Sequence, residues 1–202
     1  MLVEVTCPVC RNLNKAKCQE IPTAIDGRES DCERCGKYKI SGTVLQDNED
    51  LEGYSLTNIE RVCLSQRLRI GQIQSDIPFI MSDWLKEFRK TAKLSLPPVQ
   101  ARKIIECIGD YFSTNGEPML HFPQSKYGKI GFYDRGVLNS LVRDLKKRGL
   151  ITCVLTPDSS SGFGHPRNLN LTLSGWNEYE SLKSGLRAEK TGFLAMKFGD
   201  EI

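Results

Sequence analysis

The sequence predicts an α+β fold in three parts: a small metal-bound ribbon, a helical connector and a larger domain of helices and a hairpin. Three observations carry this prediction. Two Cys-x-x-Cys pairs lie near the N-terminus, two helical patterns follow them, and the rest of the chain alternates helical periodicity with short β-rich runs. We place the parts at residues 1–46, 47–96 and 97–185, with residues 186–202 as a tail.

The ribbon is predicted from its four cysteines, which stand in the segments CPVC and CERCG. A CxxC turn lets two thiolates point at one centre, and two such turns form a closed tetrahedral S4 site that suits Zn²⁺. Gly36 follows the second pair, where a tight turn favours positive φ. We therefore predict a structural zinc ion bound by Cys7, Cys10, Cys32 and Cys35. Iron, an iron–sulfur cluster or a redox dithiol are the alternatives for such ligands.

Within the ribbon, residues 3–5 and 38–41 have strand-like alternation around the cysteine pairs.

The connector is predicted to contain two helices. It begins with residues 47–58, which are polar and acidic. Thr57 and Glu60 form a capping-box pattern for a helix over 58–71 that ends at Gly71. After Pro78, Ser82 or Asp83 caps a second helix that runs to about residue 93.

The third part has a characteristic order of elements. Helical periodicity covers 98–113, a short strand follows at 118–122, and Asp134 caps a helix over 134–149. Strands at 150–155 and 169–173 flank a polar loop at 157–168, whose tip includes residues 159–161, and a last helix begins at 174–176. Helix, short strand, helix, hairpin and closing helix is the order of a winged-helix domain.

The helix over 134–149 occupies the recognition-helix position of such a domain. Arg135, Asn139, Arg143 and Lys147 recur at four-residue spacing on one predicted face, and Arg167 lies in the hairpin loop. These residue types contact base edges and phosphates, so we predict a DNA or RNA interface there. A solvated charged face, or a surface for a protein or for a second copy of the chain, is the alternative. The net charge of +3 is low for a nucleic-acid-binding chain.

Composition restricts the compartment. No apolar run approaches the ~18 residues of a membrane span, and the N-terminus lacks the basic start and apolar core of a signal peptide. Scattered thiols beside paired CxxC turns favour a reducing cytoplasm. The thiols outside the predicted metal site are Cys18, Cys63, Cys107 and Cys153.

No catalytic constellation is predicted, so we expect this chain not to be an enzyme. His121 and His165 are the only histidines, and neither has an evident nucleophile and orienting group. The sequence contains no Gly-rich phosphate loop and no paired-carboxylate pattern.

Several segments resemble a bacterial family of multi-domain proteins. CERCGKYKIS is similar to the family's second zinc knuckle and RVCLSQRLR to the helix that follows it. RGLITCVLTP and LNLTLSGWNEYESLKS resemble its winged-helix hairpin and closing helix. The ending KTGFLAMKFGDEI resembles the first strand and turn of its C-terminal domain. That domain is Rossmann-like and related to nucleoside 2-deoxyribosyltransferases and Toll/interleukin-1-receptor-like domains.

The resemblance implies that this chain is the sensor or targeting module of a larger cytoplasmic bacterial effector in antiphage defence. A nucleic acid or a protein would be the trigger. N-glycosidase or NAD-cleaving activity would belong to the C-terminal domain, of which this sequence holds only the first strand. The alternatives are a stand-alone DNA-binding transcriptional regulator and an enzyme that acts on a nucleoside or dinucleotide.

Overall fold

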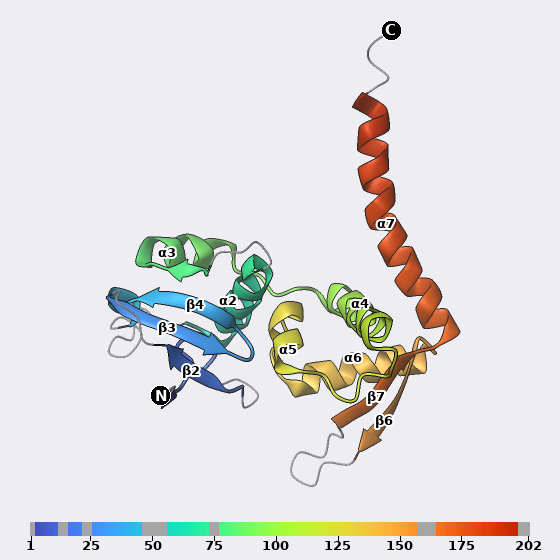
Figure 1. The fold of residues 1–202 in the computed structure, drawn as a ribbon, viewed down its shortest axis with the longest axis horizontal. Coiled ribbons are helices and arrows are strands. Elements are labelled where there is room, and N and C mark those ends of the chain that lie inside the picture. Colours follow the sequence, from blue (N-terminus) through green and yellow to red (C-terminus); the bar gives the residue numbers. More distant parts are fainter. Residues whose placement is uncertain are drawn as a thin grey trace. The chain divides into compact units, whose positions relative to one another are not determined.

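The computed structural model describes residues 3–11, 16–21, 26–45, 56–72, 77–156 and 165–197 (Figure 1). Helices and strands both contribute, in agreement with the predicted α+β class. The chain divides into two compact units. The first unit comprises Met1–Leu96 and Phe122–Leu138, and the second comprises Pro97–His121 and Asn139–Ile202. The predicted ribbon and connector ranges therefore fall in the same unit.

A five-stranded sheet organises the first unit, in the order β1-β2-β3-β4-β5. Its first four strands pair antiparallel, and β5 pairs parallel to β4. The predicted runs at 3–5 and 38–41 are present as β1 and β4, whereas the sequence did not indicate the other three. The bounds are β1 (Val3–Glu4), β2 (Cys18–Ile21), β3 (Gly27–Cys32), β4 (Gly36–Ser41) and β5 (Phe79–Ile80).

Two helices of the first unit follow the sheet. Helix α2 (Asn58–Gly71) begins with the predicted capping box, in which Thr57 and Glu60 each bond the other's backbone N–H. Helix α3 (Ser82–Thr91) starts one residue earlier than expected, so Met81 is its N-cap residue and no side chain caps it. The predicted caps Ser82 and Asp83 are wrong for this reason. Most of the acidic connector, residues 46–55, lies outside the described residues.

A short helix that the sequence did not predict, α5 (Gln124–Ile130), packs against α2. An aromatic cluster of Phe122, Tyr127 and Phe132 surrounds it, with ring centroids 5.7–6.1 Å apart in edge-to-face geometry. Gln66 on α2 donates a 2.9 Å hydrogen bond to the Ile130 carbonyl at the end of α5. These contacts hold a segment distant in sequence against α2.

The second unit is formed by helices and a hairpin. Helix α4 (Pro97–Asn115), the antiparallel strands β6 (Ile151–Thr156) and β7 (His165–Leu171), and α7 (Leu173–Lys197) follow the predicted order. Helix α6 (Arg135–Lys147) is shared by the two units, and Asp134 caps it by accepting a 2.9 Å bond from the Val137 N–H. The strand expected at 118–122 is reduced to a bridge between Met119 and Leu169. The loop tip at 159–161 lies outside the described residues.

The C-terminal segment differs from expectation. Residues 190–197, predicted as the first strand of a further domain, continue helix α7 as far as Lys197. The two sheets of the described chain offer this segment no pairing strand, and a helix satisfies its backbone groups within the segment itself. Residues 198–202 of the predicted tail lie outside the described residues.

Candidate metal centre

Four cysteine sulfurs converge in the first unit. The ligand atoms of Cys7, Cys10, Cys32 and Cys35 all lie within 4.8 Å of one another, and each residue is fully buried. The sulfurs of Cys7 and Cys35 are 3.9 Å apart, and those of Cys10 and Cys32 are 3.7 Å apart. A tetrahedral ion with metal–sulfur bonds of about 2.3 Å requires sulfurs about 3.8 Å apart. These four cysteines can therefore hold one metal ion.

The two CxxC turns have matching backbone geometry. The residue after the second cysteine of each turn adopts positive φ: Arg11 at 46° and Gly36 at 79°. The positive φ expected at Gly36 is confirmed. Arg11 also has positive φ, which is uncommon for residues other than glycine. In the first turn the Cys10 N–H also points at the Cys7 sulfur, 3.5 Å away. Both turns therefore present their sulfurs to the same centre.

Helix α2 holds the first turn through Arg61. This residue is 3% exposed, and its Nη1 donates to the Pro8 and Val9 carbonyl oxygens at 3.0 and 2.9 Å. Burial lowers the pKa of Arg61, while the nearby cysteines oppose that shift. Arg61 therefore places a guanidinium directly behind the first turn and satisfies two of its carbonyl groups.

The same helix holds the second turn through Arg69 and Gln72. The Arg69 guanidinium donates to the Arg34 carbonyl at 3.0 Å and to the Cys32 carbonyl at 3.2 Å. Gln72 Nε2 donates to the Cys35 carbonyl at 3.0 Å. Because these bonds come from one rigid helix, α2 fixes the positions of both cysteine turns.

Two hydroxyl groups face the sulfurs directly. Tyr38 Oη lies 3.0 Å from the Cys7 sulfur, and Ser65 Oγ lies 3.4 Å from the Cys35 sulfur. Burial raises the pKa of Tyr38 well above its usual value, so this hydroxyl keeps its proton and can donate to a thiolate. A hydroxyl that donates in this way orients a thiolate ligand and stabilises its negative charge, whereas Ser65 Oγ accepts from the Cys35 thiol.

The surroundings shift the pKa values of these thiols in opposite directions. Hydrogen bonds from Cys10 and Cys18 lower the pKa of Cys32, whereas burial raises the pKa of Cys35 well above its usual value. Binding of a cation to all four sulfurs would release the remaining protons.

A buried arginine supports the presence of a metal ion. Arg34 lies inside the second turn, is 0% exposed, and donates from Nη2 to the Phe132 carbonyl. Its Nε and Nη1 have no hydrogen-bond partner among the described residues. Burial lowers the pKa of Arg34, and the nearby cysteines, first Cys35, oppose this shift. A buried cation requires negative charge nearby. Four thiolates around a divalent ion supply a net charge of −2.

The predicted nucleic-acid residues do not share one exposed face. Lys147 and Arg167 are exposed, and Arg135 and Arg143 are partly buried. Asn139 is only 2% exposed, so the prediction that it faces a nucleic acid is wrong. It lies about 60° around the helix from the buried Val142, on the side of α6 that packs inward.

The exposed face of α6 is less basic than predicted. Its solvent-facing positions are Gly136, Ser140, Asp144 and Lys147, which recur at helical spacing. Basic side chains gather only at the end of the helix, where Lys146 and Arg148 are exposed beside Lys147. This arrangement is compatible with phosphate contact. It does not favour base recognition along the helix, because Asn139, the only amide side chain of α6, is buried.

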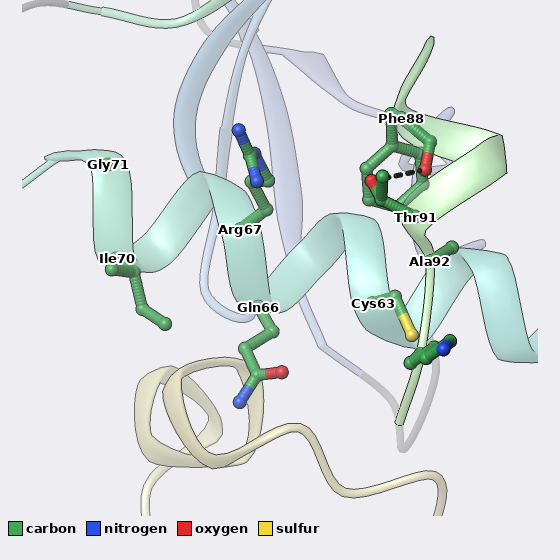
Figure 2. A pocket seen from close by; sticks show the side chains of 9 residues that line it. Cys63, Gln66, Arg67, Ile70, Gly71, Phe88, Thr91 and Ala92 are labelled. Carbon is green, nitrogen blue, oxygen red and sulfur yellow. Dashed lines mark hydrogen bonds between the residues drawn. The ribbon is translucent and has the colours of Figure 1, made fainter. Parts of the chain in front are cut away.

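A pocket of about 380 Å³ lies between α2 and α3 in the first unit (Figure 2). Its polar groups already have partners: Gln66 Nε2 bonds to the Ile130 carbonyl, and Thr91 Oγ1 bonds to the Phe88 carbonyl. The lining residues are Cys63, Gln66, Arg67, Ile70, Gly71, Phe88, Thr91, Ala92 and Lys93. Its two cations, Arg67 and Lys93, are solvent-exposed. Buried polar groups converge on the cysteine cluster instead.

Sequence reasoning found the four sulfurs and missed the residues around them. A signal was present, because the α2 residues that hold the turns recur at intervals of four, four and three, which is one helical face. These residues are Arg61, Ser65, Arg69 and Gln72.

A scan against family models, a search of curated proteins and a search of solved structures each return no match for this chain. The resemblance to the multi-domain bacterial family therefore stays a prediction. None of the helices in the described chain combines the length and apolar character needed to span a bilayer.

Proposed function

We propose that this chain is a binding module built on a structural zinc ion, which Cys7, Cys10, Cys32 and Cys35 hold. The main observation behind this proposal is the convergence of these four buried sulfurs, of which Cys7 and Cys35 are 3.9 Å apart and Cys10 and Cys32 are 3.7 Å apart. All four lie within 4.8 Å of one another, a spacing that suits one ion better than a multi-iron cluster. The set is closed and buried, as in zinc sites that stabilise a fold rather than catalyse.

Elemental analysis tests this proposal. We expect about one zinc per chain in protein purified without chelators, and a tetrahedral four-thiolate absorption spectrum after replacement by Co²⁺. One iron per chain would support the four-cysteine site but identify its metal as iron instead of zinc. Protein that folds without any metal would contradict the proposal.

We further propose that the second unit and the shared helix α6 form a winged-helix domain. The chain order α4, bridge at Met119, α6, β6, β7 and α7 supports this assignment. The Met119–Leu169 bridge lies between α4 and α6 in the chain, at the position where such a domain has its short strand. Binding, and not catalysis, is the role that we assign to it. Its place within a larger defence effector rests on the sequence resemblance alone.

Nucleic acid is the ligand that we favour for this domain. The exposed basic residues Lys147 and Arg167, with Lys146 and Arg148 at the end of α6, suit phosphate groups. Fluorescence titration of labelled duplex DNA, single-stranded DNA and RNA at two salt concentrations tests this. Replacing Lys147 and Arg167 by alanine should weaken binding at all sequences and lower the salt slope by about one per lost contact.

Arg102 supplies the matched control for this titration. It is an exposed arginine on α4, and Arg102→Ala removes a charge from the same unit without changing the proposed surface. Equal effects of the control and test variants, or binding that does not depend on salt, would exclude phosphate contact. A protein partner would then be favoured, because Val154 on β6 is 54% exposed and Leu173 is 86% exposed.

A further inference from the structure

A fifth buried thiol adjoins the four-cysteine cluster. Cys18 on β2 is 0% exposed and stands directly opposite Cys32 in the β2–β3 ladder. The neighbouring pair, Lys17 and Glu33, carries the ladder bond from the Glu33 N–H to the Lys17 carbonyl at 2.9 Å. Cys18 and Cys32 are therefore a non-hydrogen-bonded pair, the kind in which opposed side chains are closest, with Cα atoms about 4.5 Å apart.

The Cys18 side chain lies on the Cys32 side of the cluster, because the two residues are directly opposed in neighbouring strands. Interactions with Cys32 and then with Cys7 raise the pKa of Cys18 well above its usual value, so this thiol keeps its proton beside the cluster.

We propose that Cys18 is a reserve metal ligand that can take the place of Cys32. This inference rests on the proposed zinc site. In the exchange, the Cys18 sulfur forms a bond to the metal as the Cys32 sulfur leaves it. The proton of the Cys18 thiol passes to the departing Cys32 thiolate. The number of thiolates, the charge of the site and the oxidation state of every atom are unchanged.

The neighbours of each sulfur favour exchange with Cys32 over exchange with Cys7. Cys7 belongs to the first turn and is additionally held by the Tyr38 hydroxyl at 3.0 Å. Cys32 is the last residue of β3, and its strand pairing with Cys18 leaves both side chains on the same side of the sheet. The two sulfurs can therefore exchange by side-chain rotation while the backbone ladder stays in place.

Removing Cys32 or Cys35 separately tests the inference. With Cys32→Ser we expect about one zinc per chain and a Co²⁺ spectrum that retains four thiolates, because Cys18 replaces the lost ligand. With the matched control Cys35→Ser we expect a three-thiolate spectrum. The double variant Cys18→Ser/Cys32→Ser should also give three thiolates. The zinc affinity of the double variant should be at least about 10–100-fold lower than that of Cys32→Ser, which is the loss typical of removing an outer-shell partner.

A second measurement avoids variants that fail to fold. Exchange of bound zinc for an isotopically enriched zinc ion can be followed by mass spectrometry in the native protein. Cys18→Ala should keep one zinc per chain and slow this exchange by about tenfold, the effect of one modest interaction lost from the transition state. An unchanged exchange rate would contradict the inference.

The outcomes separate this inference from the proposed function. Native protein without bound zinc would overturn the zinc site itself. Native protein with one zinc, but equal loss of thiolate signal in Cys32→Ser and Cys35→Ser, would leave the zinc site intact and overturn only the role of Cys18. Cys18 would then be a buried core thiol that packs beside a metal ligand.

Discussion

The two units of this chain differ in what fills their interiors. The interior of the first unit holds six thiols, two arginines and the hydroxyl groups of Tyr38 and Ser65. The second unit buries Ile104, Ile108 and Leu169 at 1% exposure or less. The first unit therefore combines an apolar core with buried charge that must be compensated, and the second relies on removal of apolar surface from water.

The first unit shows how a charged centre can be combined with an apolar core, because it also buries Leu64, Leu68 and Ile80 at 1% exposure. Strands of two to six residues bury little apolar surface on their own. A metal ion can supply the missing free energy, on the order of 10–16 kcal/mol in comparable zinc peptides. The side chains of α2 then fix the cysteine turns through carbonyl groups. The second unit needs no such centre, because α4 and the β6–β7 hairpin close over aliphatic side chains.

Metal removal should have the largest effect, and it should affect the two units differently. A chelator should unfold the first unit and leave the second folded, because only the first unit contains the cysteine cluster. Trp84 belongs to the first unit and Trp176 to the second. Fluorescence of the single-tryptophan variants Trp176→Phe and Trp84→Phe therefore reports each unit separately. Simultaneous loss of both signals would show that the units unfold as one.

A cavity in the second unit should have the next largest effect. Ile104 on α4 is 0% exposed, so Ile104→Ala should reduce the free energy of unfolding of this unit by about 2–5 kcal/mol. Denaturant titration monitored by Trp176 measures the change. Val99→Ala on the same helix, at a 40% exposed position, should change it little. We expect zinc content to be the same in both variants.

Replacing the buried arginine should weaken metal binding. Arg34→Met keeps the side-chain length but removes the cation beside the thiolates, so zinc affinity should fall by about 10–100-fold. Competition with a chromophoric chelator gives the affinity. Arg67→Met is the matched control, because Arg67 lies on α2 but is exposed. Equal affinities of the two variants would show that the charge of Arg34 does not support the metal.

Loss of the capping box should give the smallest effect. Thr57→Ala removes the side-chain acceptor at the start of α2 and should destabilise the first unit by about 1 kcal/mol. Denaturant titration monitored by Trp84 measures it. Met81→Ala is the comparison, since Met81 is the N-cap of α3 and makes no capping hydrogen bond. A larger effect of Met81→Ala would contradict the assigned role of the cap.

The sequence alone determined the features that depend on local spacing. The two CxxC turns, the capping box at Thr57, the Asp134 cap and the order of helices and hairpin in the second unit all follow from residues close together in the chain. Local chemistry fixes these features because a turn or a cap involves only four or five residues.

The tertiary structure decided which side chains surround the metal site and which face of α6 is exposed. The bonds from α2 to the cysteine turns, the Cys18–Cys32 pairing and the burial of Arg34 join residues far apart in the sequence. Asn139 was misplaced because four-residue spacing drifts around a helix of 3.6 residues per turn, and packing alone sets where the buried side begins.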